Sequence, residues 1–272
     1  MGIVNLTPDS FSDGGRHPGL AEAIRHCERL VAEGADILDL GAESTRPGAQ
    51  PVPDAEEWAR LEPVLRASLT LGVPVSVDTR KAVVMERALA AGADVVNDVA
   101  ALQDPRAVQA VAAHPRCGVC LMHMLDDPRS MQRAPSYRDV VAEVARFLKD
   151  RLQACREAGI EGSRIVLDPG IGFGKTPDHN LSLTARLPEL LRLGQPLLIG
   201  WSRKSTLGVL TGRPVDERLP GSLAAALASV RHGAKVLRVH DVAATRDALR
   251  VWQAIEASAG DNGSIVETGE GR

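Results

Sequence analysis

The sequence predicts an α/β protein with the architecture of a (β/α)8 TIM barrel, on three observations. Short apolar runs alternate along the 272 residues with longer amphipathic stretches. A glycine recurs where a predicted helix gives way to the next strand. Hydrophobic residues make up 44% of the chain and aromatic residues only 3%, which suits a barrel interior filled by aliphatic side chains. An open, doubly wound sheet is the alternative arrangement of the same elements.

Eight short apolar segments are predicted as strands. Several are nearly continuous apolar runs, as expected of parallel strands that are buried on both faces. They comprise residues 2–6, 36–40, 74–78, 94–97, 118–122, 164–168, 196–200 and 235–239.

Amphipathic stretches between these runs are predicted as helices because their apolar residues recur at helical spacing. Examples are residues 21–33, 54–71, 137–158 and 222–232. The motifs AEGADILDL, AAGADVVND and RHGAKVLRV place Gly34, Gly92 and Gly233 just before a strand. Glycine there adopts the left-handed conformation that ends a helix. Eight such units in about 250 residues are typical of a single barrel.

Residues 1–257 are therefore expected to form one domain, and the polar, glycine-rich residues 258–272 a disordered tail. The first predicted strand starts at residue 2, with nothing before it to cover the bottom of the barrel. We expect either a barrel that is open there or a start that is internal to a longer natural chain.

Composition argues against several classes of partner. Lys and Arg number 32 against 35 Asp and Glu, so the net charge of −3 gives nucleic-acid binding no support. Neither a secretory signal nor an apolar run of 18 residues is found, so no membrane span is expected. Four cysteines do not make a disulfide framework, and a cytoplasmic location is expected.

Polar residues follow nearly every predicted strand, where barrel enzymes carry their catalytic groups. One such residue is usually a cap, but a set that converges on one rim predicts a site. The set contains Asn5, Asp39, Glu43, Ser44, Thr45, Arg46, Asp78, Asn97, Asp98, His123, Asp168, Ser202, Arg203, Lys204, Arg238 and His240. Two loops on this rim, residues 5–15 and 41–53, are rich in Gly and Pro.

Three local features have competing interpretations. Residues 202–204 open a predicted helix beside Arg238 and His240, which favours an anion site over a surface ion-pair cluster. The run DPGIGFGKT has Pro169 where a phosphate-binding loop needs glycine, so its glycines are expected to approach a flat ligand beside Asp168. Cys117 and Cys120 are expected to be structural thiols, and His123 a hydrogen-bonded rim residue in preference to a metal ligand.

Eight motifs then carry a resemblance. NLTPDSFSDGG, DLGAESTRPGA, VSVDTRK, NDV, LMHM, LDPGIGFGK, GWSRKS and RVHDV occur in this order between Gly2 and about Ile255. The chain resembles the dihydropteroate synthase family of folate biosynthesis, the target of sulfonamides. Members of that family are transferases that join 6-hydroxymethyl-7,8-dihydropterin diphosphate to 4-aminobenzoate, with loss of diphosphate.

The resemblance implies a role for each matching residue. Asp78, Asn97 and Asp168 would bind the pterin edge, and Lys204 its ring. The flat slot would be shaped by Val99, Met122, Phe173 and Gly200.

It also implies how the other groups are bound. Asn5, Arg238 and His240 would hold the diphosphate, with Mg²⁺ on Asn5. The set around the diphosphate and the aminobenzoate would be Thr45, Arg46 and Ser202, and the catalytic set Lys204, Arg238, His240 and Asp78. A homodimer through helices near the C-terminus is implied as well.

Two departures from the family pattern are expected to have limited effects. Ala42 stands where the family usually has glycine, which should restrict the second loop slightly. The family's usual extension before the first strand is absent from this sequence, which should affect stability more than chemistry. Two alternative functions remain: a pterin-binding methyltransferase barrel, and a pterin-binding protein without catalytic activity.

Overall fold

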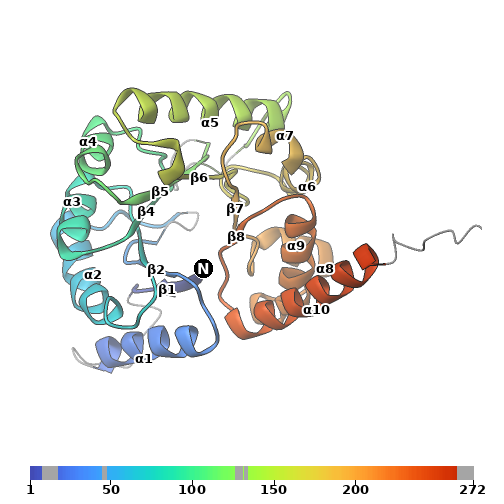
Figure 1. The fold of residues 1–272 in the computed structure, drawn as a ribbon, viewed down its shortest axis with the longest axis horizontal. Coiled ribbons are helices and arrows are strands. Elements are labelled where there is room, and N and C mark those ends of the chain that lie inside the picture. The colour runs from blue at the N-terminus through green and yellow to red at the C-terminus, as the bar shows by residue number, and fades with distance from the viewer. Residues whose placement is uncertain (8–17, 45–47, 126–130, 132–133, 262–272) are drawn as a thin grey trace, which may run out of the picture.

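A ring of parallel strands surrounded by helices forms the protein in the computed structural model, which describes residues 1–7, 18–44, 48–125, 131 and 134–261 (Figure 1). The strands are β1 (Gly2–Asn5), β2 (Leu38–Gly41), β3 (Val75–Asp78), β4 (Val95–Asp98), β5 (Gly118–Met122), β6 (Ile165–Asp168), β7 (Leu198–Ile199) and β8 (Val236–Leu237). All eight predicted strands are thus present, although β7 and β8 are shorter than predicted.

The strands close into a barrel in chain order. β1 to β6 form one parallel sheet, and β7 pairs in parallel with β8. Single bridges, Leu167 to Leu197 and Gly2 to Val239, join the two sheets on both sides. The backbone N–H of Ile3 donates to the Val239 carbonyl at 2.9 Å. The predicted barrel is confirmed, in preference to the open sheet.

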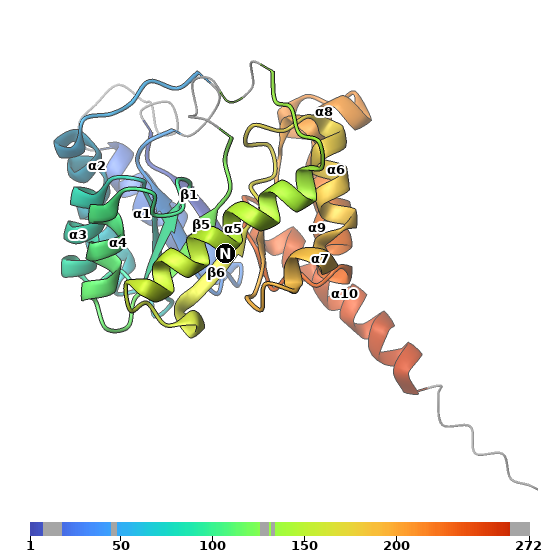
Figure 2. The ribbon, with the colours of Figure 1, turned by 90° about the horizontal axis from the view of Figure 1, so that it is seen from above.

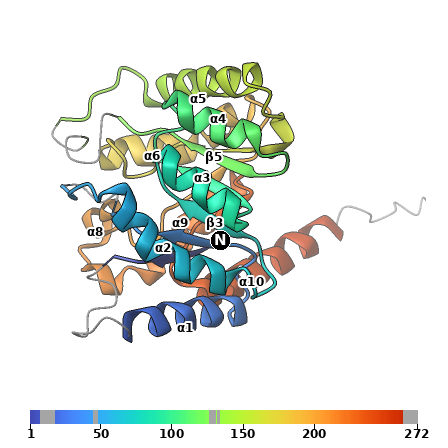
Figure 3. The same cartoon turned by 90° about the vertical axis from the view of Figure 1, so that its left-hand side faces the viewer.

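Helices cover the outside of the ring (Figure 3). The α-helices are α1 (Pro18–Ala32), α2 (Asp54–Ser68), α3 (Ala82–Ala91), α4 (Pro105–Ala113), α5 (Val140–Glu157), α6 (Pro177–Ala185), α7 (Leu187–Leu191), α8 (Ser205–Thr211), α9 (Leu219–Arg231) and α10 (Val242–Asp261), with 3-10 turns η2 (Gly162–Arg164) and η3 (Val215–Glu217). Within the described part of the chain, none of these helices has the length and apolarity needed to span a bilayer.

Predicted helix ends differ from the observed ends by up to three residues. The helix after β7 begins at Ser205 and not at Ser202, because residues 202 and 203 form a turn in which Arg203 has a positive φ of 60°. Helix α10 continues to Asp261 and projects from the body of the barrel (Figure 2). Residues 258–261 are therefore helical, in contrast to the predicted tail, whose residues 262–272 lie outside the described part.

The glycine prediction is confirmed at all three helix ends. Gly34, Gly92 and Gly233 have φ values of 92°, 110° and 101°, which is the left-handed region. Each follows the last turn of a helix, so the next strand starts within a few residues at the bottom of the barrel.

Strand side chains are buried on both sides of the ring. Leu40, Val77, Val96, Leu121 and Leu167 have no exposed surface and belong to hydrophobic clusters that include residues of the surrounding helices. The alternating residues of the same strands therefore point into the barrel. This alternation decides which polar side chains can meet.

Candidate active site at the carboxyl ends of the strands

Strand register places Asn5, Asp78, Asn97 and Asp168 on the inward face of the ring, whereas Asp98 faces outward and accepts the backbone N–H groups of Ala100 and Leu102. Asn5 of β1 pairs with Gly41 of β2, and Gly41 pairs with Asp78 of β3. Asp78 also pairs with Asn97 of β4, and Met122 of β5 pairs with Asp168 of β6. Partners in a parallel ladder share a face of the sheet. Side chains from β1, β3, β4, β5 and β6 therefore converge at the carboxyl end of the barrel interior.

Arg238 is the cation at the centre of this group. Its Nε donates to Asp39 Oδ2 at 2.6 Å, and its Nη2 donates to Asp78 Oδ2 at 2.8 Å. Asn97 Nδ2 also donates to Asp39 Oδ2, at 3.1 Å. The Asp39 side chain is fully buried and that of Asp78 is 10% exposed. One guanidinium thus links side chains of β2 and β3, and the shared carboxylate of Asp39 adds Asn97 from β4.

The charges in this cluster perturb one another. Burial raises the pKa of the Asp78 carboxyl to about 7, against the opposing effect of the Arg238 guanidinium. Burial opposes the charge of Arg238, but the carboxylates of Asp39 and Asp78 hold its pKa above the usual value. With two carboxylates on one cation, Arg238 keeps a partner when a ligand engages Asp78.

Asp168 forms a second acceptor on the same face. Its Oδ1 accepts the backbone N–H of Gly170 at 2.7 Å, and burial raises the pKa of the carboxyl. Lys204 lies nearby, with its Nζ 4.0 Å from the centre of the Phe173 ring. A cation over an aromatic face fixes both groups. Lys204 comes from the segment after β7, and Phe173 comes from the segment after β6.

His240 is held by Ser202 across the ends of β7 and β8. Ser202 Oγ lies 2.9 Å from His240 Nδ1, and the backbone N–H of His240 donates to the same oxygen at 3.2 Å. Burial, with the charges of Arg203 and Arg238, lowers the pKa of His240 to about 3. At neutral pH this imidazole offers hydrogen bonds and no positive charge.

The remaining predicted residues are placed as follows. Val99 is buried just after β4, Met122 is 3% exposed at the inward end of β5, and Gly200 follows β7 beside Arg238. Thr45 and Arg46 lie outside the described residues.

Two of the glycines after Asp168 lie where the chain packs closely against itself, a role that the sequence alone does not predict. A Cβ on Gly170 would lie 1.9 Å from the backbone oxygen of His123, and one on Gly174 would lie 2.5 Å from Leu125 Cβ. Both glycines also have positive φ. Glycine is required at both positions because the chain approaches itself closely there. Of the three glycines, only Gly172 faces Lys204, which is predicted to contact the ligand.

Asp39, Lys175 and His123 are polar residues of the interior that the resemblance leaves without a role. Lys175 Nζ lies 2.9 Å from His123 Nδ1 and donates to the Phe173 carbonyl at 2.9 Å. Burial lowers the pKa of Lys175 to about 7, and burial with the Lys175 charge lowers that of His123 to about 3. His123 is thus hydrogen-bonded, as expected. A charged residue inside an apolar strand is the sequence signal that marks Asp39.

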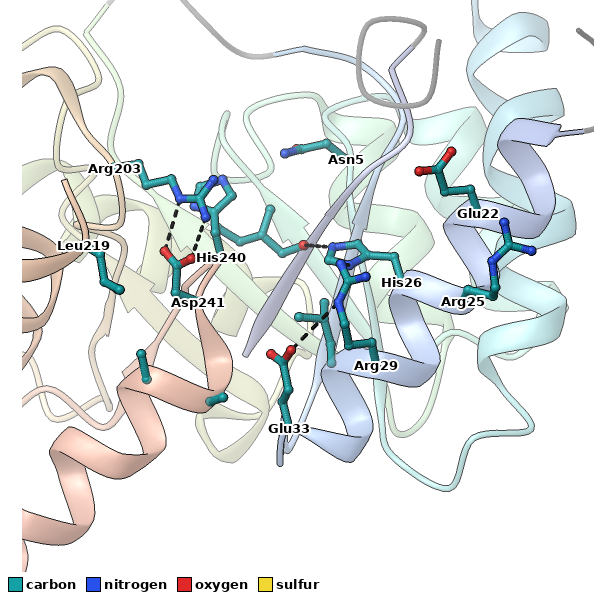
Figure 4. A pocket seen from close by; sticks show the side chains of 14 residues that line it. Asn5, Glu22, Arg25, His26, Arg29, Glu33, Arg203, Leu219, His240 and Asp241 are labelled. Carbon is teal, nitrogen blue, oxygen red and sulfur yellow. Dashed lines mark hydrogen bonds and ion pairs between the residues drawn. The ribbon is translucent and has the colours of Figure 1, made fainter. Parts of the chain in front are cut away.

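A cleft of about 690 Å³ between α1 and α10 reaches the edge of this site (Figure 4). Asn5 and His240 line it, together with the Arg203–Asp241 pair and charged residues of α1. In the described ranges, no three His, Cys, Asp or Glu side chains are grouped so that they could hold a metal ion.

The fold and this site define a barrel enzyme, and the family described as pterin binding enzyme matches residues 1–240. A dihydropteroate synthase of Neisseria meningitidis serogroup B is 58% identical over 261 residues, covering 94% of this chain and 92% of the relative. The chain therefore belongs to the dihydropteroate synthase family of pterin-binding enzymes.

Solved structures agree with this assignment. Xanthomonas albilineans dihydropteroate synthase with 4-aminobenzoic acid has a TM-score of 0.89 and 53% identity, covering 94% of this chain and 92% of that one. The Yersinia pestis enzyme in a sulfonamide drug complex has a TM-score of 0.88 and 44% identity, covering 94% and 93%.

Removing the central cation should destabilise the fold. Arg238→Met leaves Asp39 and Asp78 buried without their partner, which should cost about 3–5 kcal/mol in the free energy of unfolding at pH 8. Arg246→Met is the matched control, since the Arg246–Asp36 pair is exposed and should contribute less than about 1 kcal/mol. Urea unfolding measures both. Equal losses in the two variants would contradict the central role of Arg238.

Proposed function

We propose that this chain is a transferase that condenses 6-hydroxymethyl-7,8-dihydropterin diphosphate with 4-aminobenzoate to give 7,8-dihydropteroate and diphosphate in folate biosynthesis. The observation that carries the proposal is the buried set of inward-facing acceptors around Arg238 at the carboxyl ends of the strands. The names of its relatives support it: they are dihydropteroate synthases, one of them in complex with 4-aminobenzoic acid.

In this proposal Asp78, Asn97 and Asp168 bind the polar edge of the pterin. Carboxylates accept from amino and ring N–H donors, and each charge-assisted bond contributes about 1.5–3 kcal/mol. The three residues are inward-facing, and Asn97 and Asp168 are buried, so water competes little for them. Lys204 contacts the ring, and the walls of the slot are Val99, Met122, Phe173 and Gly200.

The diphosphate binds at the β1–β8 corner, to Asn5, Arg238 and His240. Because His240 is neutral, it supplies a hydrogen bond, and Arg238 supplies the charge. The residues fit Mg²⁺ in the mode in which one or two protein oxygens, the substrate phosphates and water share the metal. The Asn5 side-chain oxygen would be the protein ligand. When bound, Mg²⁺ neutralises part of the charge of the leaving diphosphate.

Chemistry then requires little of the protein beyond positioning. The bond between the pterin methylene carbon and the diphosphate oxygen breaks, and the electron pair leaves with diphosphate. The electron-rich dihydropterin stabilises the positive charge on the methylene carbon. The aniline nitrogen of 4-aminobenzoate, neutral at pH 7, forms the new C–N bond and then loses a proton. No strong base is needed to remove this proton. Thr45, Arg46 and Ser202 orient the second substrate.

Exposed apolar side chains support a homodimer through the C-terminal helices. Val209 and Leu210 on α8, Val215 in η3, and Val251 and Ile255 on α10 are all more than half exposed. Burying them against a second copy removes this apolar surface from water.

We also propose that sulfonamides compete for the 4-aminobenzoate site. A cytoplasmic location is proposed as well, since all four cysteines are free.

A turnover assay tests the proposed reaction. The chain with both substrates and Mg²⁺ should release diphosphate and form dihydropteroate in equal amounts. Asp78→Asn should lower kcat/KM for the pterin diphosphate roughly 10²-fold or more, since the amide presents a donor to a donor. Protonation of Asp78 below about pH 7 should lower kcat/KM in the wild type through the same loss of an acceptor.

Exposed Asp36 provides the control, Asp36→Asn, which should retain wild-type kinetics. Binding of the pterin without release of diphosphate would contradict the proposal, and would indicate the non-catalytic pterin-binding protein instead.

The second substrate should bind only after diphosphate or the pterin diphosphate. In this proposal its walls come from the two Gly- and Pro-containing loops, and fixing each loop residue costs about 1–2 kcal/mol of backbone entropy. A small benzoate cannot offset that cost, whereas diphosphate with Mg²⁺ contacts both loops and Arg238 together. Calorimetric titration of 4-aminobenzoate with and without Mg²⁺-diphosphate measures the coupling. Equal affinities in the two titrations would exclude this order of binding.

A further inference from the structure

Thr79, Arg80 and Lys81 directly follow Asp78 in the motif VSVDTRK, and the proposed function gives them no role. The ammonium group of Lys81 lies at the centre of a buried ion cluster. Its Nζ donates to Glu43 Oε2 at 2.7 Å and to Glu57 Oε2 at 2.6 Å. The Glu43 and Glu57 side chains are 7% and 1% exposed. The cluster therefore joins the segment after β2, the end of β3 and helix α2.

The same cluster bonds both ends of the second loop, residues 41–53, to the body of the barrel. Val52 N–H donates to Glu43 Oε2 at 2.8 Å, and Lys81 Nζ donates to the Val52 carbonyl. Residues 43 and 52 are nine positions apart, yet both are bonded to one ammonium group. Arg60 of α2 also donates to the Ala42 carbonyl, at 3.2 Å. Both ends of the segment 43–52 are thereby fixed to the body of the barrel.

The charges of the cluster are balanced. Arg80 Nε donates to Glu43 Oε1 at 3.1 Å, so two cations face two carboxylates. Thr79 Oγ satisfies the other oxygen of Glu57, at 2.6 Å. Burial opposes the charge of Lys81, but Glu43 and Glu57 raise its pKa. Removal of one buried partner leaves an uncompensated charge, so the members hold one another in place.

From this geometry we propose, resting on the proposed function, that Glu43, Lys81 and Glu57 are positioning residues for 4-aminobenzoate. The segment whose ends they fix carries Thr45 and Arg46 in its sequence. Its base is tied to residues 79–81, directly after the strand end that presents Asp78 to the pterin. A loop with fixed ends has less conformational entropy to lose when it binds a ligand. The cluster thus holds the loop that binds the second substrate in a fixed position relative to Asp78, which binds the first substrate.

Glu43→Gln tests the proposal, because it keeps the shape of the side chain and removes one charge. The KM for 4-aminobenzoate should rise about 10-fold or more, while the KM for the pterin diphosphate should stay within about twofold of the wild type. The inhibition constant of a sulfonamide should rise in parallel. If Glu43→Gln does not fold, Glu43→Gln/Arg80→Met removes one charge of each sign and leaves the Lys81–Glu57 pair intact. This variant should show the same split between the two KM values.

Arg66→Met is the matched control on α2, since the Arg66–Glu62 pair is exposed, and both KM values should be unchanged. Unchanged KM for 4-aminobenzoate in a folded cluster variant would overturn the proposal. An equal rise in both KM values would overturn it as well, since that is the effect of a general loss of structure.

Failure of the proposed function is recognised separately. If the wild type releases no diphosphate, calorimetry of 4-aminobenzoate with Mg²⁺-diphosphate still compares the wild type with Glu43→Gln. A weaker affinity in the variant supports the positioning role, and equal affinities overturn it.

Discussion

The guanidinium of Arg238, bonded to Asp39 at 2.6 Å and to Asp78 at 2.8 Å, is the interaction on which the interior depends. A carboxylate without a cation is costly to bury, and Asp39 has no exposed surface. Arg238 directly follows β8. A single bridge, Gly2 to Val239, joins the β7–β8 pair to β1. The ion pairs therefore also connect the last strand with β2 and β3 across the barrel interior.

The same arrangement prepares the site for a ligand. In the proposed function, Asp39 stays paired with Arg238 and Asn97 while Asp78 exchanges the guanidinium for the pterin, so the cation keeps a partner. In the proposed reaction Arg238 contacts the diphosphate, while Asp78 binds the ring to which that diphosphate is attached. Three residues after Asp78, Lys81 forms a second buried ion cluster with Glu43 and Glu57 at the base of the second loop. In the two proposals, each substrate is bound by side chains that a buried ion cluster holds in position.

Local sequence signals predicted most of the fold and the membership of the rim. The strand Gly118–Met122 has the predicted bounds, and Gly34, Gly92 and Gly233 adopt the predicted left-handed conformation, because these features depend on neighbouring residues. The partner of Asp39 could not be predicted in this way, since it lies 199 positions away and depends on closure of the barrel. The role of Gly170 was also out of reach, because the clash that requires glycine involves the backbone of His123. Lys81 shows the same limit: its motif is recognisable, but its three partners are 24 to 38 positions away.

In the proposed function, Asp39 holds Arg238 so that Asp78 can bind the pterin, and Asp39→Asn tests this dependence most directly. Without the Asp39 charge, Arg238 should remain on Asp78 and compete with the ligand. The kcat/KM for the pterin diphosphate should therefore fall roughly 10²-fold, the size expected for loss of a preorganised electrostatic contact. The KM for 4-aminobenzoate, measured at saturating pterin diphosphate, should be unchanged. A folded Asp39→Asn variant with wild-type kcat/KM for the pterin diphosphate would show that Asp78 binds the pterin without help from Asp39.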